Sequence, residues 1–95
     1  GGQGCISVSA NVAPKLMADI QKATLAGDFA TAKELEGKAY KLHRALFRSS
    51  SPGPTKYALS TLGLCEPDIR LPLMGPDESV KAEVVEAMQF AGVTA

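Results

Sequence analysis

Residues 1–14 read GGQGCISVSANVAP, and this stretch decides how the rest of the sequence is interpreted. Small and β-branched residues over Cys5–Val8 predict a short, buried strand, and the glycines before it permit tight-turn geometry. Asn11 and Pro14 then predict the start of a helix, because proline is tolerated in a first helical turn. No other part of the sequence predicts a strand, and a lone strand leaves its backbone N–H and C=O groups without partners. We therefore expect the chain to be part of a larger fold.

Four helices are predicted after this stretch, and glycine and aspartate mark their ends. Gly27, Gly63 and Gly92 are placed to end helices, and Asp28 and Asp77 are placed to cap the start of the helices that follow them. The predicted helices cover residues 13–26, 55–62 and 77–91, and a longer one follows Asp28 with an apolar stripe made by Ala32, Leu35, Ala39, Leu42 and Leu46. The sequence therefore predicts one strand followed by a mostly helical chain.

Two further features concern packing. Gly37 interrupts the longest predicted helix at a cost of about 1 kcal/mol relative to alanine, which close helix packing would explain. Residues 65–76 carry three prolines and predict an extended segment, whose apolar part, Ile69–Leu73, is expected to lie across helices.

Composition excludes several classes of function. The 95 residues suffice for one small domain, and 10 basic and 10 acidic residues leave no net charge to attract nucleic acid or an anionic membrane. No apolar run approaches the roughly 20 residues needed to cross a bilayer. Cys5 and Cys65 are far apart, so we expect two free, buried thiols in a cytoplasmic protein. With one histidine and no cluster of ligands, no metal or other cofactor is implied.

Several residues that resemble catalytic groups are expected to be structural. The glycines of residues 1–4 precede the predicted strand, whereas a phosphate-binding loop follows one. His43 has no nucleophile or carboxylate arranged beside it in sequence, and Lys56, just after a proline turn at a helix start, is expected to be a surface or ion-pairing lysine. Ser7 and Ser9 are expected to pack and form hydrogen bonds rather than act as nucleophiles.

The order and spacing of several short motifs resemble one enzyme family over essentially the whole chain. Residues 1–14 resemble the last barrel strand of the dihydrodipicolinate synthase (4-hydroxy-tetrahydrodipicolinate synthase) family. Further similarity lies in LHRALF at 42–47, PGPTKYAL at 52–59, LGL at 62–64 and IRLPL at 69–73. Residues 48–51 depart from the resemblance, because RSSS stands where the family usually has a Glu-Pro-Asn-like run.

The resemblance implies an α/β fold, a (β/α)₈ TIM barrel with a helical C-terminal extension. Residues 1–27 would be the last β/α unit of the barrel, and residues 28–95 the extension. The family condenses pyruvate with aspartate semialdehyde in lysine biosynthesis, through a Schiff base between pyruvate and a lysine. That lysine belongs to an earlier strand, so the resemblance places no catalytic residue in this chain and predicts that the chain alone is inactive. It also implies a homo-oligomer, usually a tetramer.

One site residue carries over by resemblance. Ile6 matches the family's isoleucine whose main-chain carbonyl faces the bound pyruvate, at a strand end where barrels build their sites. Two other interpretations stay open. The chain could belong to a related aldolase, such as an N-acetylneuraminate lyase or a keto-deoxy-sugar aldolase. It could also be a free-standing helical interaction domain, in which residues 28–95 would fold without the first 26.

Overall fold

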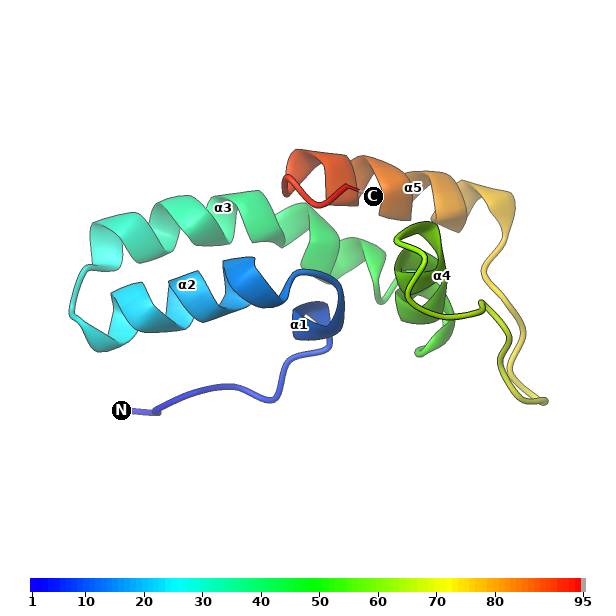
Figure 1. The fold of residues 1–95 in the computed structure, drawn as a ribbon, viewed down its shortest axis with the longest axis horizontal. Coiled ribbons are helices and arrows are strands. Elements are labelled where there is room, and N and C mark those ends of the chain that lie inside the picture. The colour runs from blue at the N-terminus through cyan, green and yellow to red at the C-terminus, as the bar shows by residue number, and fades with distance from the viewer. Residues whose placement is uncertain (95) are drawn as a thin grey trace.

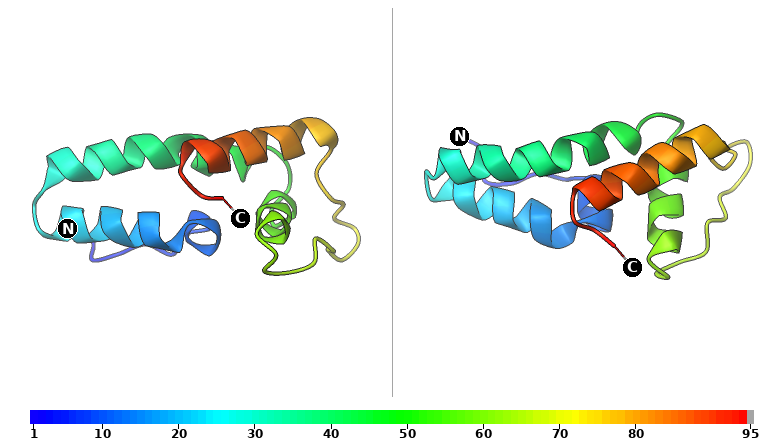
Figure 2. Two further views of the ribbon diagram at one scale, coloured as in Figure 1. Left: turned by 45° about the horizontal axis from the view of Figure 1, so that its top comes forward. Right: turned by 90° about the horizontal axis from the view of Figure 1, so that it is seen from above.

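Five helices make up the secondary structure of residues 1–94, the part of the chain that a computed structural model describes (Figure 1). They are α1 (Ser9–Val12), α2 (Pro14–Leu25), α3 (Phe29–Ala45), α4 (Gly53–Thr61) and α5 (Glu78–Phe90). Helices α2 and α3 form an antiparallel hairpin, and α5 lies over the C-terminal half of α3 (Figures 1 and 2). Helix α4 packs against both α5 and α1. The molecule is therefore elongated, with principal extents of 43 × 23 × 21 Å.

Capping geometry confirms the helix ends predicted at Gly27, Gly63 and Gly92 and the helix starts predicted at Asp28 and Asp77, whereas α1 was not predicted. Gly27, Gly63 and Gly92 have φ angles of 76°, 72° and 77°, the left-handed conformation that ends a helix at glycine. The carboxylate of Asp28 accepts a hydrogen bond from the Thr31 N–H at 3.1 Å, and that of Asp77 accepts one from the Val80 N–H at 2.9 Å. Each carboxylate thus satisfies a backbone donor that the first turn of its helix leaves unpaired.

The predicted strand over Cys5–Val8 is absent from the structure. Residues 1–7 form an irregular segment that runs beside α2, and Val8 already has helical dihedral angles as the N-cap of α1 (Figure 1). Gly2 and Gly4 do not adopt positive φ, so the expected tight turn is also missing. The physical reason is the lack of a pairing partner, because no other strand occurs within residues 1–94 and an isolated strand cannot satisfy its backbone.

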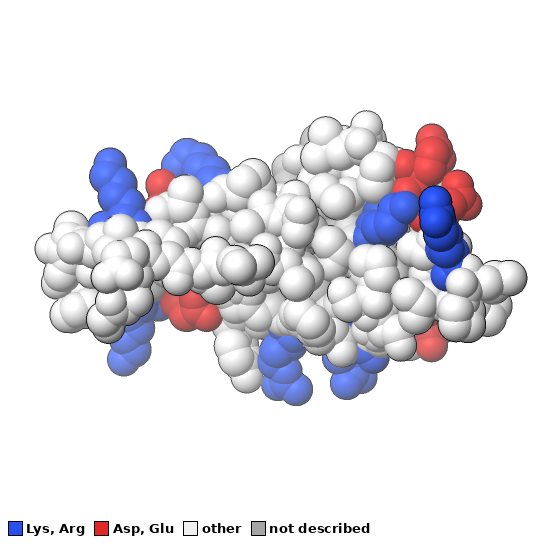
Figure 3. Space-filling view, turned by 90° about the horizontal axis from the view of Figure 1, so that it is seen from below, with Lys and Arg blue, Asp and Glu red and all other residues white. Residues whose placement is uncertain are grey.

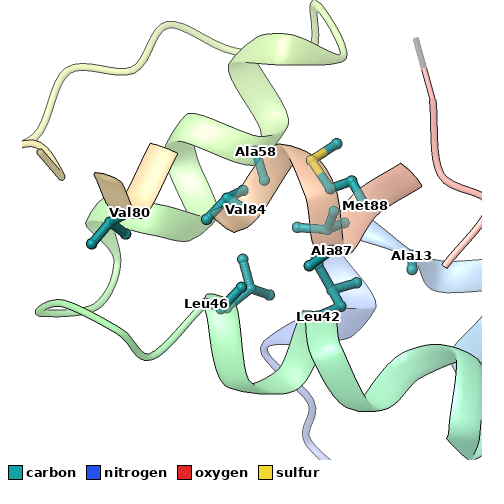
Figure 4. Close-up of a cluster of buried hydrophobic side chains, with 10 residues drawn as sticks. Ala13, Leu42, Leu46, Ala58, Val80, Val84, Ala87 and Met88 are labelled. Carbon is teal, nitrogen blue, oxygen red and sulfur yellow. The ribbon is translucent and has the colours of Figure 1, made fainter. Parts of the chain in front are cut away.

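The core forms where four helices meet. Its buried side chains come from α1, α3, α4 and α5 and from the residues next to these helices: Val12, Ala13, Leu42, Ala45, Leu46, Ala58, Val80, Val84, Ala87 and Met88 (Figure 4). Leu42, Leu46 and Val84 are completely buried. Helix α2 buries no side chain fully, although it lies along α3. The apolar stripe predicted for α3 is confirmed by burial: Ala32, Ala39, Leu42 and Leu46 are buried and Leu35 is half-buried, and Leu42 and Leu46 join this core.

Three packing expectations are wrong, at least in part. Cys5 and Cys65 are free as predicted, but both are exposed, because each lies in a segment outside the helices. Gly37 lies on an exposed part of α3 with nothing within 4 Å of the place a Cβ would occupy, so no close packing explains it. In the loop between α4 and α5, Ile69 packs near Gly53, whereas Leu71 is exposed because no helix lies outside it.

Replacing Gly37 by alanine is expected to stabilise the chain. The substitution removes the backbone entropy of glycine inside a helix, which is worth about 1 kcal/mol. For a domain of this size, that gain raises the melting temperature by roughly 4–8 °C. Gly27→Ala is the matched control, because its Cβ also meets nothing within 4 Å but its φ is 76°. It should lower stability by about 1 kcal/mol. Equal shifts for the two variants in thermal melts would contradict this account.

The acid sensitivity of the chain is expected to depend on the Asp77 cap. Hydrogen bonds from the Ser79 side chain and the Val80 N–H hold the pKa of the Asp77 carboxyl below its usual value. A carboxyl with a lowered folded-state pKa stabilises the fold above its unfolded pKa of about 4 and loses this effect as the pH falls through the folded value.

Asp77→Asn keeps an acceptor at the N-cap but cannot titrate. The fall in melting temperature between pH 5 and pH 2 (roughly the window of that titration) should therefore be smaller in this variant than in the parent chain. Asp68→Asn, in an exposed loop, serves as the control and should show the same fall in melting temperature between pH 5 and pH 2 as the parent chain (roughly the same window). An equal fall in melting temperature in Asp77→Asn and the parent chain would show that the Asp77 cap does not cause the acid sensitivity.

Candidate functional site

Ile6, the one site residue carried over by resemblance, lies in the irregular segment before α1. Its side chain is fully exposed. Among residues 1–94, no hydrogen-bond donor reaches its main-chain carbonyl. The carbonyl is therefore available as an acceptor, as a contact with a bound substrate would require.

The backbone immediately after Ile6 is held by a compact set of local hydrogen bonds. The Val8 carbonyl accepts from the Asn11 backbone N–H at 3.1 Å and from the Asn11 side-chain amide at 3.0 Å. The Ser7 hydroxyl accepts from the Ala10 N–H at 3.2 Å. These bonds explain why a sequence rich in β-branched and small residues turns into α1 here, since Ser7 and Asn11 offer the backbone local partners that a strand without a neighbour lacks.

A buried serine connects α1 to α3. The Ser9 hydroxyl lies 2.6 Å from Nδ1 of His43, which is 34 residues away in sequence, and Ser9 is only 2% exposed. The other ring nitrogen of His43, Nε2, lies 3.3 Å from Oε1 of Glu36. Glu36 and His43 share one face of α3 because they are two helical turns apart. A carboxylate only accepts, so the tautomer that satisfies both contacts donates from Nε2 to Glu36 and accepts a hydrogen bond from the Ser9 hydroxyl at Nδ1.

The order serine, histidine and carboxylate resembles the arrangement of a hydrolytic triad, but the burial of Ser9 argues against such chemistry. The nearest surface cleft, of about 340 Å³, is lined by Ser7, Glu36 and His43 among others and not by Ser9. A nucleophile has to meet its substrate, so the three residues act here as a structural chain. This agrees with the structural roles predicted for His43 and Ser9, although their pairing with each other was not predicted.

The remaining candidates also have structural surroundings. Lys56 donates a hydrogen bond to the main-chain carbonyl of Asp68 and so ties the loop before α5 to α4. Within residues 1–94, His, Cys, Asp and Glu side chains do not come together in any group of three that could hold a metal ion. None of the helices described is long and apolar enough to cross a membrane.

Comparison with protein families identifies the class of protein. The model of the dihydrodipicolinate synthetase family matches residues 1–91. The chain therefore belongs to the dihydrodipicolinate synthetase family, and the resemblance found in the sequence is confirmed.

Curated relatives carry one particular name. The chain is 53% identical over 93 residues to the 4-hydroxy-tetrahydrodipicolinate synthase of Phenylobacterium zucineum, a match that covers 98% of this chain and 32% of the relative. The enzyme of the same name from Hyphomonas neptunium is also 53% identical, again over 98% of this chain and 32% of its own length. The chain thus spans about a third of the length of the curated relatives it matches.

Solved structures agree with these matches. A dihydrodipicolinate synthase from Thermotoga maritima superimposes with a TM-score of 0.92 at 35% identity, covering 97% of this chain and 31% of that one. A chloride-inhibited dihydrodipicolinate synthase from Acinetobacter baumannii, complexed with pyruvate, gives a TM-score of 0.91 at 41% identity, covering 98% and 32%. The helical arrangement described here is therefore that of a portion of these enzymes.

The hydrogen bond between Ser9 and His43 is expected to contribute measurably to stability. Ser9→Ala removes a hydrogen bond to the partly buried ring of His43 and should lower the free energy of unfolding by about 0.5–1.5 kcal/mol. In a double-mutant cycle with His43→Phe, urea unfolding should give a coupling energy of about 0.5–1.5 kcal/mol. Ser60→Ala is the control, because its hydroxyl bonds to the Tyr57 carbonyl within α4, and its effect should add to that of His43→Phe. Additivity for Ser9 as well would mean that the contact contributes nothing.

Proposed function

We propose that this chain is the C-terminal portion of a 4-hydroxy-tetrahydrodipicolinate synthase. The intact enzyme condenses pyruvate with aspartate semialdehyde in lysine biosynthesis, through a Schiff base with a lysine that lies outside residues 1–95. The observation that carries the proposal is the 53% identity over 98% of the chain to relatives that bear this name. This identity over the matched third of the relatives supports the same reaction for the intact enzyme.

In this proposal, residues 1–27 are the last β/α unit of a (β/α)₈ barrel and residues 28–95 are its helical extension. The segment around Cys5–Val8 becomes a strand only when neighbouring barrel strands supply its hydrogen bonds. The face along which the N-terminal segment runs is mostly uncharged, with basic and acidic side chains gathered mainly toward its edges (Figure 3). An uncharged face of this kind is typical of a surface that another part of a protein covers.

The main-chain carbonyl of Ile6 then faces pyruvate in the intact enzyme. Support comes from its free carbonyl and from its place at the end of the proposed strand, where barrel enzymes build their sites. No cofactor or metal enters the reaction, because the lysine itself forms the imine. We place the intact enzyme in the cytoplasm as a homo-oligomer, usually a tetramer by the family resemblance. One solved relative is described as a monomeric dihydrodipicolinate synthase variant.

The alternatives receive less support. Relatives at 47–53% identity are named 4-hydroxy-tetrahydrodipicolinate synthase, which favours the synthase over an N-acetylneuraminate lyase or a keto-deoxy-sugar aldolase. The family match from residue 1 onward disfavours a free-standing helical interaction domain that begins at residue 28.

A hybrid enzyme tests the proposal. The 93 matched residues of the Phenylobacterium zucineum synthase are replaced by those of this chain, and the consumption of pyruvate with aspartate semialdehyde is followed. We expect turnover within about tenfold of the unmodified relative, that is, a loss of at most about 1.4 kcal/mol in transition-state stabilisation. The 95-residue chain alone should show neither turnover nor a pyruvate adduct that borohydride can trap.

The controls separate a failed function from a failed fold. The hybrid must melt cooperatively, near the temperature of the unmodified relative, before its activity is interpreted. A folded hybrid that consumes no pyruvate would overturn the proposal. If the hybrid turned over N-acetylneuraminate or a keto-deoxy-sugar and not aspartate semialdehyde, the chain would instead be assigned to the corresponding aldolase.

A further inference from the structure

The hydrogen bond between Ser9 and His43 has a special place in the connectivity of the chain. Among residues 1–94, it is the only hydrogen bond that joins residues 1–12 to α3, α4 or α5. The other bonds of this stretch are local and only shape α1. The polar link between the segment that carries Ile6 and the rest of the described chain is therefore a single contact.

The groups around Ser9 and His43 restrict the geometry of this hydrogen bond. The Ser9 hydroxyl is buried and lies 2.6 Å from Nδ1 of His43, so it has little freedom to take another partner. The Glu36 carboxylate, 3.3 Å from Nε2, fixes the ring orientation and the position of the proton. Val12 at the end of α1 and the adjoining Ala13 are buried in the core that α3, α4 and α5 also line. Apolar packing thus holds one end of α1, and the histidine holds the other.

We propose that His43, oriented by Glu36, is a positioning residue for pyruvate binding, acting through Ser9 on the backbone that carries the Ile6 carbonyl. This inference rests on the function proposed above. Ser9 follows Ile6 by three residues, and Ser7 and Val8 between them are tied to α1 by hydrogen bonds. A shift of the Ser9 side chain therefore moves the attachment point of the Ile6 segment. His43 itself does not touch the substrate.

The proposal predicts a change in substrate binding rather than a general loss of activity. A displaced Ile6 carbonyl weakens the contact with pyruvate and leaves the contacts of the aldehyde substrate intact. In the hybrid enzyme, His43→Phe should raise the KM for pyruvate about tenfold, with less than about a twofold change in the KM for aspartate semialdehyde; the tenfold rise is the loss expected from roughly one hydrogen bond.

Two substitutions of the same histidine separate its contacts. The asparagine side-chain oxygen lies near the position of Nδ1 and can still accept a hydrogen bond from the Ser9 hydroxyl. The longer glutamine side chain instead reaches toward Glu36 and leaves the Ser9 hydroxyl without a partner. The KM for pyruvate should therefore return toward the parent value in His43→Asn but stay high in His43→Gln. Ser9→Ala should match His43→Phe, and combining the two should raise KM no further, because both remove the same bond.

Val84→Ala is the control for general destabilisation. Val84 is completely buried in α5, so its truncation costs stability without removing the hydrogen bond between Ser9 and His43. Its KM for pyruvate should stay at the parent value. A rise equal to that of His43→Phe would overturn the positioning role and leave only a structural one. Equal KM values in His43→Asn and His43→Gln would overturn it as well.

The measurements distinguish failure of this inference from failure of the proposed function. If the parent hybrid turns over and the KM for pyruvate is unchanged in His43→Phe, the inference is wrong and the function stands. If the parent hybrid folds and binds pyruvate but does not condense it, calorimetry replaces KM, and the Kd for pyruvate should follow the same order of variants. A folded parent hybrid that binds no pyruvate would overturn both.

Discussion

The packing of the α3 apolar stripe against its neighbours is the constraint on which the described structure depends. Leu42 and Leu46 are completely buried, and the side chains around them come from α1, α4 and α5 (Figure 4). Each of these helices is short, and helices of this length are marginal in water on their own. These short helices therefore depend on the shared core around Leu42 and Leu46, and on their packing against one another.

The same stripe links the helical part of the chain to its N-terminal segment. On the apolar side, Val12 and Ala13 join the core, and on the polar side, Ser9 bonds to His43. Helix α1 also packs against α2 and α4, so α3 contributes to its placement through the shared core and through this hydrogen bond. If the chain completes a barrel enzyme, as proposed, the extension does more than cover one end of the barrel. Under the same proposal, it also fixes the backbone that carries the Ile6 carbonyl.

Local signals in the sequence predicted most of the helices because those signals act over a few residues. Gly27 and Asp28 end one helix and begin the next through their own backbone and side-chain geometry, and Asp77 does the same for α5. The strand at Cys5–Val8 was predicted from equally local features and is absent, because a strand depends on partners from elsewhere. The pairing of Ser9 with His43 was also beyond sequence reasoning, since the two residues are 34 positions apart and each alone is an ordinary polar residue.

The sequence by itself determined the helical boundaries, the apolar stripe of α3 and membership of the family, because these depend on residue type, on periodicity and on the order of short motifs. Only the tertiary structure decided that both cysteines are exposed, that Gly37 has open space beside it and that a buried hydroxyl connects α1 to α3. Burial and hydrogen-bond partnership are properties of which segments meet in space. Which distant segments meet cannot be deduced from single residues, whereas helix caps and apolar stripes depend only on residues close together in the sequence.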